Sequence, residues 1–290
     1  MSETVSSEPT HILTLSCADR PGIVARVAGE IAAFGGNIAE SAQFWDRGPN
    51  RFFMRIAFIS PKGVDRDAIL ARLAPAAEEF GLDLQVTDLA RPPRILILVS
   101  KFDHCLEHLL YQIRVGWLKA EVAGIVSNHE DAAIIAVRAG LPFHHWPVNK
   151  ATKARQEGLI EGLIEAENPD LIVLARYMQV MSNEFSARHF GKAINIHHSF
   201  LPSFKGARPY HQAHERGVKL IGATAHYVTA ELDEGPIIEQ ETERVGHAQS
   251  PEDLVATGRD IESRVLARAV KLHLERRVLL NGRKTVVFRD

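Results

Sequence analysis

The chain has 290 residues, of which 46% are hydrophobic and 24% are charged. This length and composition can bury a sizeable core, exclude a disordered chain and favour two domains over one. The net charge of −2 gives no reason to expect a nucleic-acid partner. No apolar run approaches the ~20 residues that span a bilayer, so no membrane partner is expected either.

The N-terminal residues and the cysteines bear on the location of the protein. Residues 1 to 10 form a polar tail without the apolar segment of a secretory signal peptide. The two cysteines, Cys17 and Cys105, lie far apart in the sequence. Such a pair is typical of reduced thiols, so we expect a cytoplasmic protein without a disulfide.

The first domain is expected over residues 11 to 88, where the hydrophobic pattern indicates the element order βαββαβ. Strands alternate apolar and polar residues, and helices repeat apolar residues every three or four positions. Gly-rich or Pro-containing turns separate them. The expected strands cover residues 11 to 17, 38 to 45, 53 to 59 and 82 to 86, and the helices cover 23 to 34 and 69 to 80. This order is that of a ferredoxin-like fold.

Two segments of this domain resemble the ACT domain, a small regulatory module that often binds amino acids. They are the loop Asp19-Arg20-Pro21-Gly22-Ile23 and the strand start Gly36-Asn37-Ile38. The resemblance implies a possible effector site at Asp19, Gly22 and Asn37, because free backbone N–H groups at a helix start suit a carboxylate. The alternative is that these residues only shape turns and that the module serves assembly. We expect a homo-oligomer, a dimer or a tetramer, because an open four-stranded sheet leaves unpaired edges.

A linker is expected at residues 89 to 94, where Pro92 and Pro93 resist both helix and central strand. The second domain then covers residues 95 to 290, in which strands and helices alternate. Such alternation indicates a Rossmann-like, doubly wound α/β sheet, with ligands at the carboxyl ends of its strands. The expected strands cover 94 to 100, 122 to 127, 142 to 145, 171 to 175, 193 to 196, 223 to 228, 236 to 243 and 284 to 288. The expected helices cover 103 to 113, 131 to 139, 152 to 165 and 250 to 274.

Asn195 and His197 stand two residues apart on a strand, so both side chains point to one face. Asp233 lies in an acidic loop further along the chain and is able to orient the imidazole. An amide donor, an imidazole and a carboxylate together can polarise a carbonyl group and move a proton. A metal site made of His197, His198, His226 and Asp233 is the rival reading. Adjacent His197 and His198 are expected on opposite faces of the strand, so no metal is predicted.

These residues resemble the folate-dependent formyltransferase family. The family pattern Asn-x-His-x-Ser-Leu-Leu-Pro, then His-x-Val, then Asp-x-Gly is matched by Asn195, His197, Ser199, Leu201, Pro202, His226, Val228, Asp233 and Gly235, with Phe200 in place of one Leu. The resemblance implies that Asn195, His197 and Asp233 are catalytic and surround the formyl group of 10-formyltetrahydrofolate. His226 and His198 are expected to support them, and the alternative for His226 is a hydrogen-bonded histidine of the core. Whether His197 stabilises an oxyanion or shuttles a proton is open.

The resemblance also implies a folate site at the end of the strand 171 to 175. The residues expected to bind the folate are Arg176, Tyr177, Met178, Gln179, Met181 and Lys205. Methionines suit the faces of a flat heterocycle. The alternative for Met178 and Met181 is that they belong to the core of the following helix.

The loop at residues 99 to 105 indicates which branch of the family the chain resembles. Transformylases carry a Gly-rich phosphate loop there, whereas this loop has no glycine and contains Asp103, which would repel a phosphate. The ACT module and His198 resemble the formyltetrahydrofolate deformylases, in which water is the acceptor. The implied activity is hydrolysis of 10-formyltetrahydrofolate to formate and tetrahydrofolate without a cofactor, with the products passing to one-carbon and purine metabolism. The alternatives are a phosphoribosylglycinamide formyltransferase and a non-catalytic folate or amino-acid sensor.

Overall fold

The computed structural model describes residues 8–201 and 209–289, so Pro202 and Lys205 lie outside the described residues. The chain divides into two compact units on either side of the Pro92-Pro93 pair. Two short segments near the C-terminus, beginning at Arg276 and Val286, group with the first unit rather than with the rest of residues 95 to 290.

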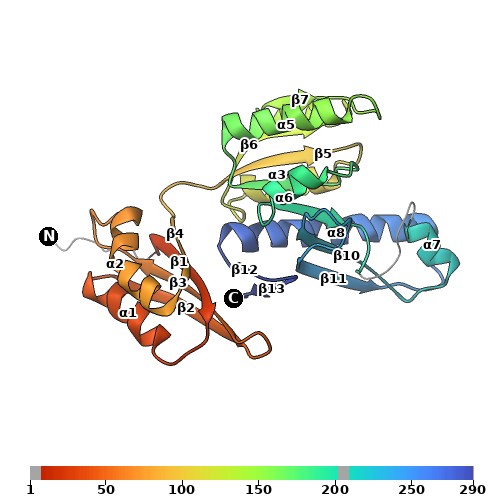
Figure 1. Cartoon of the computed structure of the whole chain (residues 1–290). Helices are drawn as coiled ribbons and strands as arrows, with labels where there is room; N and C mark the ends of the chain where they lie inside the picture. The colour runs from red at the N-terminus through yellow and green to blue at the C-terminus, as the bar shows by residue number, and fades with distance from the viewer. Residues whose placement is uncertain (1–7, 202–208, 290) are drawn as a thin grey trace. The chain divides into compact units, whose positions relative to one another are not determined.

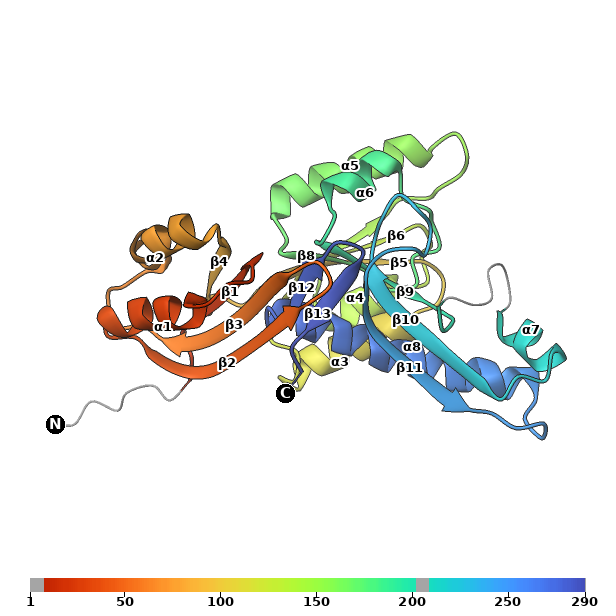
Figure 2. The same cartoon turned by 60° about the horizontal axis from the view of Figure 1, so that its bottom comes forward.

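The first unit is an antiparallel sheet with two helices on one face (Figures 1 and 2). Its strands pair in the order β2-β3-β1-β4, which is the expected ferredoxin-like arrangement. The elements are β1 (His11–Ala18), α1 (Ile23–Ala33), β2 (Asn37–Asp46), β3 (Arg51–Ile59), α2 (Arg66–Phe80) and β4 (Asp83–Asp88).

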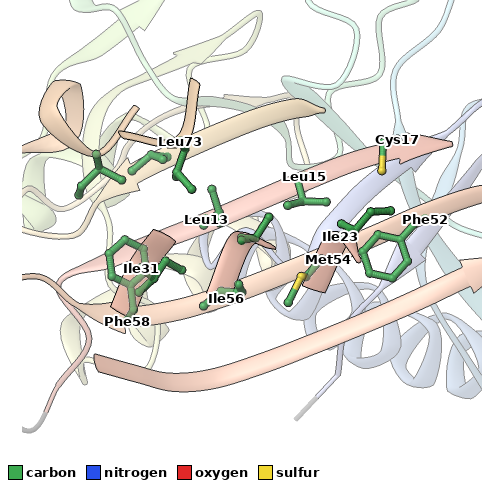
Figure 3. Packing of buried hydrophobic residues seen from close by; sticks show 13 residues of the cluster. Leu13, Leu15, Cys17, Ile23, Ile31, Phe52, Met54, Ile56, Phe58 and Leu73 are labelled. Atoms are coloured by element: carbon green, nitrogen blue, oxygen red, sulfur yellow. The ribbon is translucent and has the colours of Figure 1, made fainter. Parts of the chain in front are cut away.

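One continuous apolar core holds this unit together. Alternate residues of β1 and β3 point toward α1 and α2, because side chains alternate across a strand. Figure 3 shows Leu13 and Leu15 of β1 beside Met54 and Ile56 of β3, with Ile31 of α1 next to Phe58. The other face of the sheet is covered at Phe53 by the C-terminal residues Val286 and Phe288. The sequence does not predict this second contact, because the two segments are more than two hundred residues apart.

The second unit is built on a seven-stranded sheet in the order β11-β10-β9-β8-β5-β6-β7. The five strands from β9 to β7 are parallel, and β10 and β11 are antiparallel to their neighbours. The strands are β5 (Arg94–Val99), β6 (Glu121–Ser127), β7 (Phe143–His145), β8 (Leu171–Leu174), β9 (Ala193–His197), β10 (Leu220–Tyr227) and β11 (Ile237–Arg244). The doubly wound prediction is confirmed, with an antiparallel pair added at one edge.

Helices cover both faces of this sheet, as Figure 2 shows, with α5 and α6 on one face and α3 and α8 on the other. The helices are α3 (His104–Arg114), α4 (Ala133–Ala139), α5 (Lys153–Glu167), α6 (Asn183–Arg188), α7 (Pro209–Glu215) and α8 (Pro251–Leu274). The expected start of α8 is confirmed, because Ser250 and Asp253 form a reciprocal capping box. None of the helices within the described ranges is both long and apolar enough to cross a membrane.

Three elements have no predicted bounds, although a helix was considered after Met181, where α6 lies. The short helices α6 and α7 each have about two turns or fewer, which is too short for a hydrophobic period to stand out. Strand β12 (Val278–Asn281) pairs only with β13 (Lys284–Val287), which was expected as the last strand. The hairpin is explained by Gly282, whose φ of 61° suits a tight turn.

Candidate active site

A cavity of about 250 Å³ opens at the carboxyl ends of β8 and β9, where a doubly wound sheet is expected to bind ligands. The expected catalytic residues and five of the six expected folate residues line it; the sixth, Lys205, lies outside the described residues. Its lining is Leu174, Arg176, Tyr177, Met178, Gln179, Val180, Met181, Ser186, Asn195, Ile196, His197, His198, His226, Val228, Thr229, Ala230, Leu232 and Asp233.

The sheet register sets the first contact of the site. Asn195 on β9 lies directly opposite His226 on the antiparallel strand β10. Side chains of such opposed residues share a face and lie close together. The Asn195 Nδ2 atom is accordingly 3.4 Å from His226 Nε2.

Asp233 reaches this pair from the loop between β10 and β11. Its backbone has a φ of 58°, in the left-handed region that Asp adopts more readily than most residues. Its Oδ2 lies 3.2 Å from His197 Nδ1, and its Oδ1 lies 3.7 Å from His226 Nε2. One carboxylate therefore contacts both imidazoles.

The partners of each imidazole assign its protons. A carboxylate only accepts, so His197 Nδ1 carries a hydrogen and donates it to Asp233. His197 Nε2 is buried and has no hydrogen-bond partner within the described part of the chain, so its lone pair is unused. His226 Nδ1 donates to the Tyr227 carbonyl at 2.9 Å; its Nε2 accepts from Asn195 when the ring is neutral and donates toward Asp233 when the ring is charged. His226 thus orients the Asn195 amide, a supporting position.

Asp233 is held in its ionised form. Burial by itself would raise the pKa of this carboxyl group, but the hydrogen bonds and charges of His197 and His226 outweigh burial. The resulting pKa lies well below the usual range for Asp. The pocket therefore contains a fixed negative charge at neutral pH.

The structure corrects the expectation for His198. Strand β9 ends at His197, so the alternation of a strand no longer applies to the next residue. The two rings stack with centroids 5.1 Å apart, and both line the cavity instead of lying on opposite faces. Burial lowers the pKa of His198 to about 4, with further contributions from the charges of Arg176 and His197. His198 is therefore neutral at physiological pH.

The residues after β8 divide into two groups. The Tyr177 hydroxyl donates to Gln156 Oε1 at 2.8 Å, and burial raises the Tyr177 pKa to about 12, so this side chain belongs to the wall. Met178 is 54% exposed and lies before α6, which argues against the alternative that it is core. Met181 lines the cavity and also packs on the apolar core.

Sequence reasoning missed several apolar residues of the wall. Val180, Ile196 and Leu232 flank the expected residues and line the same cavity. Their signal in the sequence is only their position beside the matched motifs, since apolar residues at strand ends are common in any fold.

The loop after β5 holds the segment that follows β8. Ser100 Oγ donates to Asn128 Oδ1 at 2.7 Å and accepts from the Met178 backbone N–H at 3.0 Å. Asp103 precedes α3 and makes no side-chain cap. The N-cap position of α3 thus carries a carboxylate, whose negative charge disfavours a bound phosphate.

One buried group in the second unit has side chains of the metal-binding type, namely His104, Cys105 and Glu262. It contains none of the residues considered above for a metal. Burial raises the Cys105 pKa well above its usual range, which disfavours the thiolate that a metal requires. The Arg176 Nε lies 3.3 Å from Glu262 Oε2, so a cation already occupies this carboxylate.

Comparison with known proteins places the chain in a family. The model of the formyl transferase family matches residues 93–270, and that of the ACT domain matches residues 11–75. A formyltetrahydrofolate deformylase of a Corynebacterium species is 47% identical over 286 residues, 98% of this chain and 100% of the relative. The chain belongs to the formyltetrahydrofolate deformylase family.

Solved structures separate this family from the transformylases. The crystal structure of formyltetrahydrofolate deformylase from Burkholderia mallei has 52% identity and a TM-score of 0.92, covering 97% of this chain and 100% of that one. Glycinamide ribonucleotide transformylase 1 from Symbiobacterium toebii has 30% identity and a TM-score of 0.65, covering 70% of this chain and 97% of that one. The likeness to the deformylase includes the ACT domain, and the likeness to the transformylase does not span the chain.

The expected effector residues lie in the ACT domain. Gly22 precedes α1 with a φ of 99°, a conformation that favours glycine. The Asp19 backbone N–H donates to the Asn50 carbonyl at 3.1 Å, and Asn37 is the first residue of β2. This backbone contact continues the β1–β3 pairing beyond Ala18 and Arg51, and the role of Asp19 toward an effector stays a prediction.

Proposed function

We propose that this protein hydrolyses 10-formyltetrahydrofolate to formate and tetrahydrofolate. The observation that carries the proposal is the contact of Asp233 with both His197 and His226 beside Asn195, in a cavity with an apolar wall. Membership of the deformylase family over nearly the whole chain supports the same reaction. In this proposal the folate is the substrate and no cofactor takes part.

The apolar wall of the cavity suits the pterin ring. Met178 and Met181 supply soft side chains, and Gln179 supplies an amide for the polar edge of the ring. Bound there, the substrate would present its N10-formyl group toward Asn195 and His197. The role of Lys205 toward the folate remains part of the proposal.

The proposed first step is the attack of water on the formyl carbon. His197 Nε2 takes the proton of the water, and Asp233, which accepts from Nδ1, stabilises the imidazolium that results. In the same step the formyl oxygen becomes an oxyanion. The Asn195 amide, oriented by His226, donates to it, a contact typically worth about 3 kcal/mol in the transition state.

The proposed second step cleaves the bond between carbon and N10. His197 Nε2 returns the proton to N10 as that bond breaks, so the leaving group is neutral tetrahydrofolate. The carbon departs as formic acid, which loses its remaining acidic proton and becomes formate. Asp233 returns to its starting contacts, and no group of the protein is consumed.

The loop after β5 favours water as the acceptor. A phosphate-bearing acceptor needs free backbone N–H groups at that place, and Asp103 offers a negative charge instead. We therefore rank transfer to glycinamide ribonucleotide below hydrolysis. The sensor alternative is weaker still, because it has no use for the precise contact of Asp233 with His197.

The surroundings of the reaction are further parts of the proposal. We propose a homo-oligomer, an amino-acid effector at Asp19, Gly22 and Asn37, and a role in one-carbon and purine metabolism. We also propose a cytoplasmic location, which is consistent with two buried, unpaired cysteines.

The experiment that tests the reaction is an incubation with 10-formyltetrahydrofolate in which formate is measured with and without glycinamide ribonucleotide. Formate release at the same rate in both mixtures supports hydrolysis. If the formyl group moves only when the acceptor is present, the protein is a transferase and the proposal is wrong.

A further inference from the structure

Arg176 has a backbone that a side chain of its kind rarely adopts. It follows β8 directly with a φ of 63°, in the left-handed region that favours glycine. Strained residues of this type persist where the surrounding structure holds them, and they cluster at ligand sites. A glycine would form this turn without strain, so the side chain of Arg176 calls for an explanation.

The guanidinium of Arg176 is buried and incompletely paired. Its side chain is 10% exposed, and its Nε lies 3.3 Å from Glu262 Oε2 without hydrogen-bond geometry. Its Nη1 has no hydrogen-bond partner among residues 8–201 and 209–289. A buried N–H group without an acceptor is costly, and for a charged group the cost is larger. Such a group in a cavity wall indicates an anionic ligand.

Glu262 does not satisfy this cation by itself. Its carboxylate also accepts from the Tyr210 hydroxyl at 2.7 Å and contacts His104 Nε2 at 2.9 Å. Three groups thus share two oxygens, and Arg176 takes the longest of these contacts. Among the described residues that line the cavity, only Arg176, at Nε and Nη1, and His197, at Nε2, have buried side-chain nitrogens without a hydrogen-bond partner.

The charges of the cavity favour this reading. Hydrolysis converts a neutral formyl group into a formate anion close to the ionised Asp233, which repels it. Arg176 is the one Arg or Lys among the described lining residues, and its charge reaches His198, which stacks on His197. A guanidinium is also the side chain best matched to a carboxylate.

We propose that Arg176 binds the carboxylate of formate through its unpaired guanidinium N–H, so that the product has its own subsite beside His198. This inference rests on the proposed function for the identity of the ligand. Arg176 was expected to bind the folate because of its position after β8. The proposal assigns it instead to the formate product.

The test is a titration of ¹³C-labelled sodium formate into the full-length protein without folate, followed by NMR line broadening, with sodium chloride at equal ionic strength as reference. Arg176→Gln should weaken formate binding on the order of tenfold or more, the loss expected for a charge-assisted hydrogen bond. Arg188→Gln is the matched control, because Arg188 is exposed and pairs with Glu161. It should bind formate as the wild type does.

A second variant moves the affinity the other way. Glu262→Gln removes the competing negative charge and keeps Arg176, so formate should bind severalfold more tightly. Unchanged or weaker binding in Glu262→Gln overturns the inference, also where Arg176→Gln proves unfolded by circular dichroism. Wild-type protein that binds no formate but releases it from 10-formyltetrahydrofolate disproves the subsite and leaves the proposed function standing. If the protein binds formate but releases none from 10-formyltetrahydrofolate, the subsite stands and the proposed function is wrong.

Discussion

Asp233 is the residue on which the proposed chemistry depends most, because its carboxylate contacts His197 and His226 at once. Asp233→Asn should keep the fold and folate binding and lower turnover by at least ~100-fold, the loss expected for a group that acts in the transition state. Asn195→Ala should lose a similar factor through the oxyanion. Turnover assays with folate binding and thermal melting as controls check both, and near-normal turnover removes that residue from the catalytic set.

The lowered pKa of His198 predicts how the stability of the protein depends on pH. Its pKa falls from 6.5 to about 4 on folding, so between these values the unfolded chain binds a proton that the folded chain does not. Stability should therefore decrease as pH falls through this window, and it should gain nothing from His198 above it. In His198→Asn, the slope of the unfolding free energy against pH should be smaller across this window, by the amount that corresponds to about one bound proton. Denaturant titrations at several pH values measure this; equal slopes for both proteins contradict the pKa.

The sequence predicts the direction of a side chain well where one local rule, such as the alternation along a strand, determines it. The spacing of Asn195 and His197 is enough to place both side chains in one cavity, because strand periodicity is rigid. Strand periodicity does not apply to His198, because the strand has ended there. The sequence also does not predict the ion pair of the Arg176 guanidinium with Glu262, which lies on a helix far along the chain. Contacts between distant segments depend on tertiary packing, which local patterns do not contain.

The strand pair β10 and β11 positions the catalytic carboxylate, and Gly235 is the residue that lets its loop close. A Cβ atom at Gly235 would lie 1.7 Å from the Tyr227 carbonyl oxygen, which is backbone and cannot move aside. The carbonyl oxygen of the next residue, Pro236, accepts from the Tyr227 N–H at 3.0 Å. This hydrogen bond holds the two ends of the loop between β10 and β11 together.

Gly235→Ala should therefore displace Asp233 from His197 and lower turnover by about tenfold or more, since small misplacements of catalytic groups have large effects. Its melting temperature should fall as well, because overpacking strains the strand pair. Gly246→Ala is the control, since a Cβ there meets nothing closer than 4.0 Å. Equal turnover in both variants would show that the close approach at Gly235 has no functional importance.

Elements were predictable where hydrophobic periods were long. The strands of the first unit and the helix α8 lie close to their expected bounds, because many residues share each period. The short helices α6 and α7 and the strand β12 were missed. The antiparallel direction of β10 against β9 also does not follow from the sequence pattern, which is the same for both directions.

For the whole molecule, the ACT domain is proposed to serve assembly and regulation. Its strands β2 and β4 are the edges of the four-stranded sheet, and unpaired edges favour association. The protein should be at least a dimer at micromolar concentration by light scattering, and a monomer would contradict this.

Glycine, methionine or another common amino acid should change the rate through Asp19, Gly22 and Asn37, which requires unequal binding to two states. A screen without effect on rate or melting leaves the domain as an assembly module.

In the proposed reaction, the site around Asn195, His197 and Asp233 transfers the formyl group to water. Turnover of 10-formyltetrahydrofolate in ¹⁸O-labelled water, without any other acceptor, tests it most directly by mass spectrometry of the formate. The mechanism predicts one ¹⁸O atom from the solvent in each formate, formed at the enzymatic rate and lost with Asp233→Asn. Formate without the label, or no formate until an amine acceptor is added, would contradict the account.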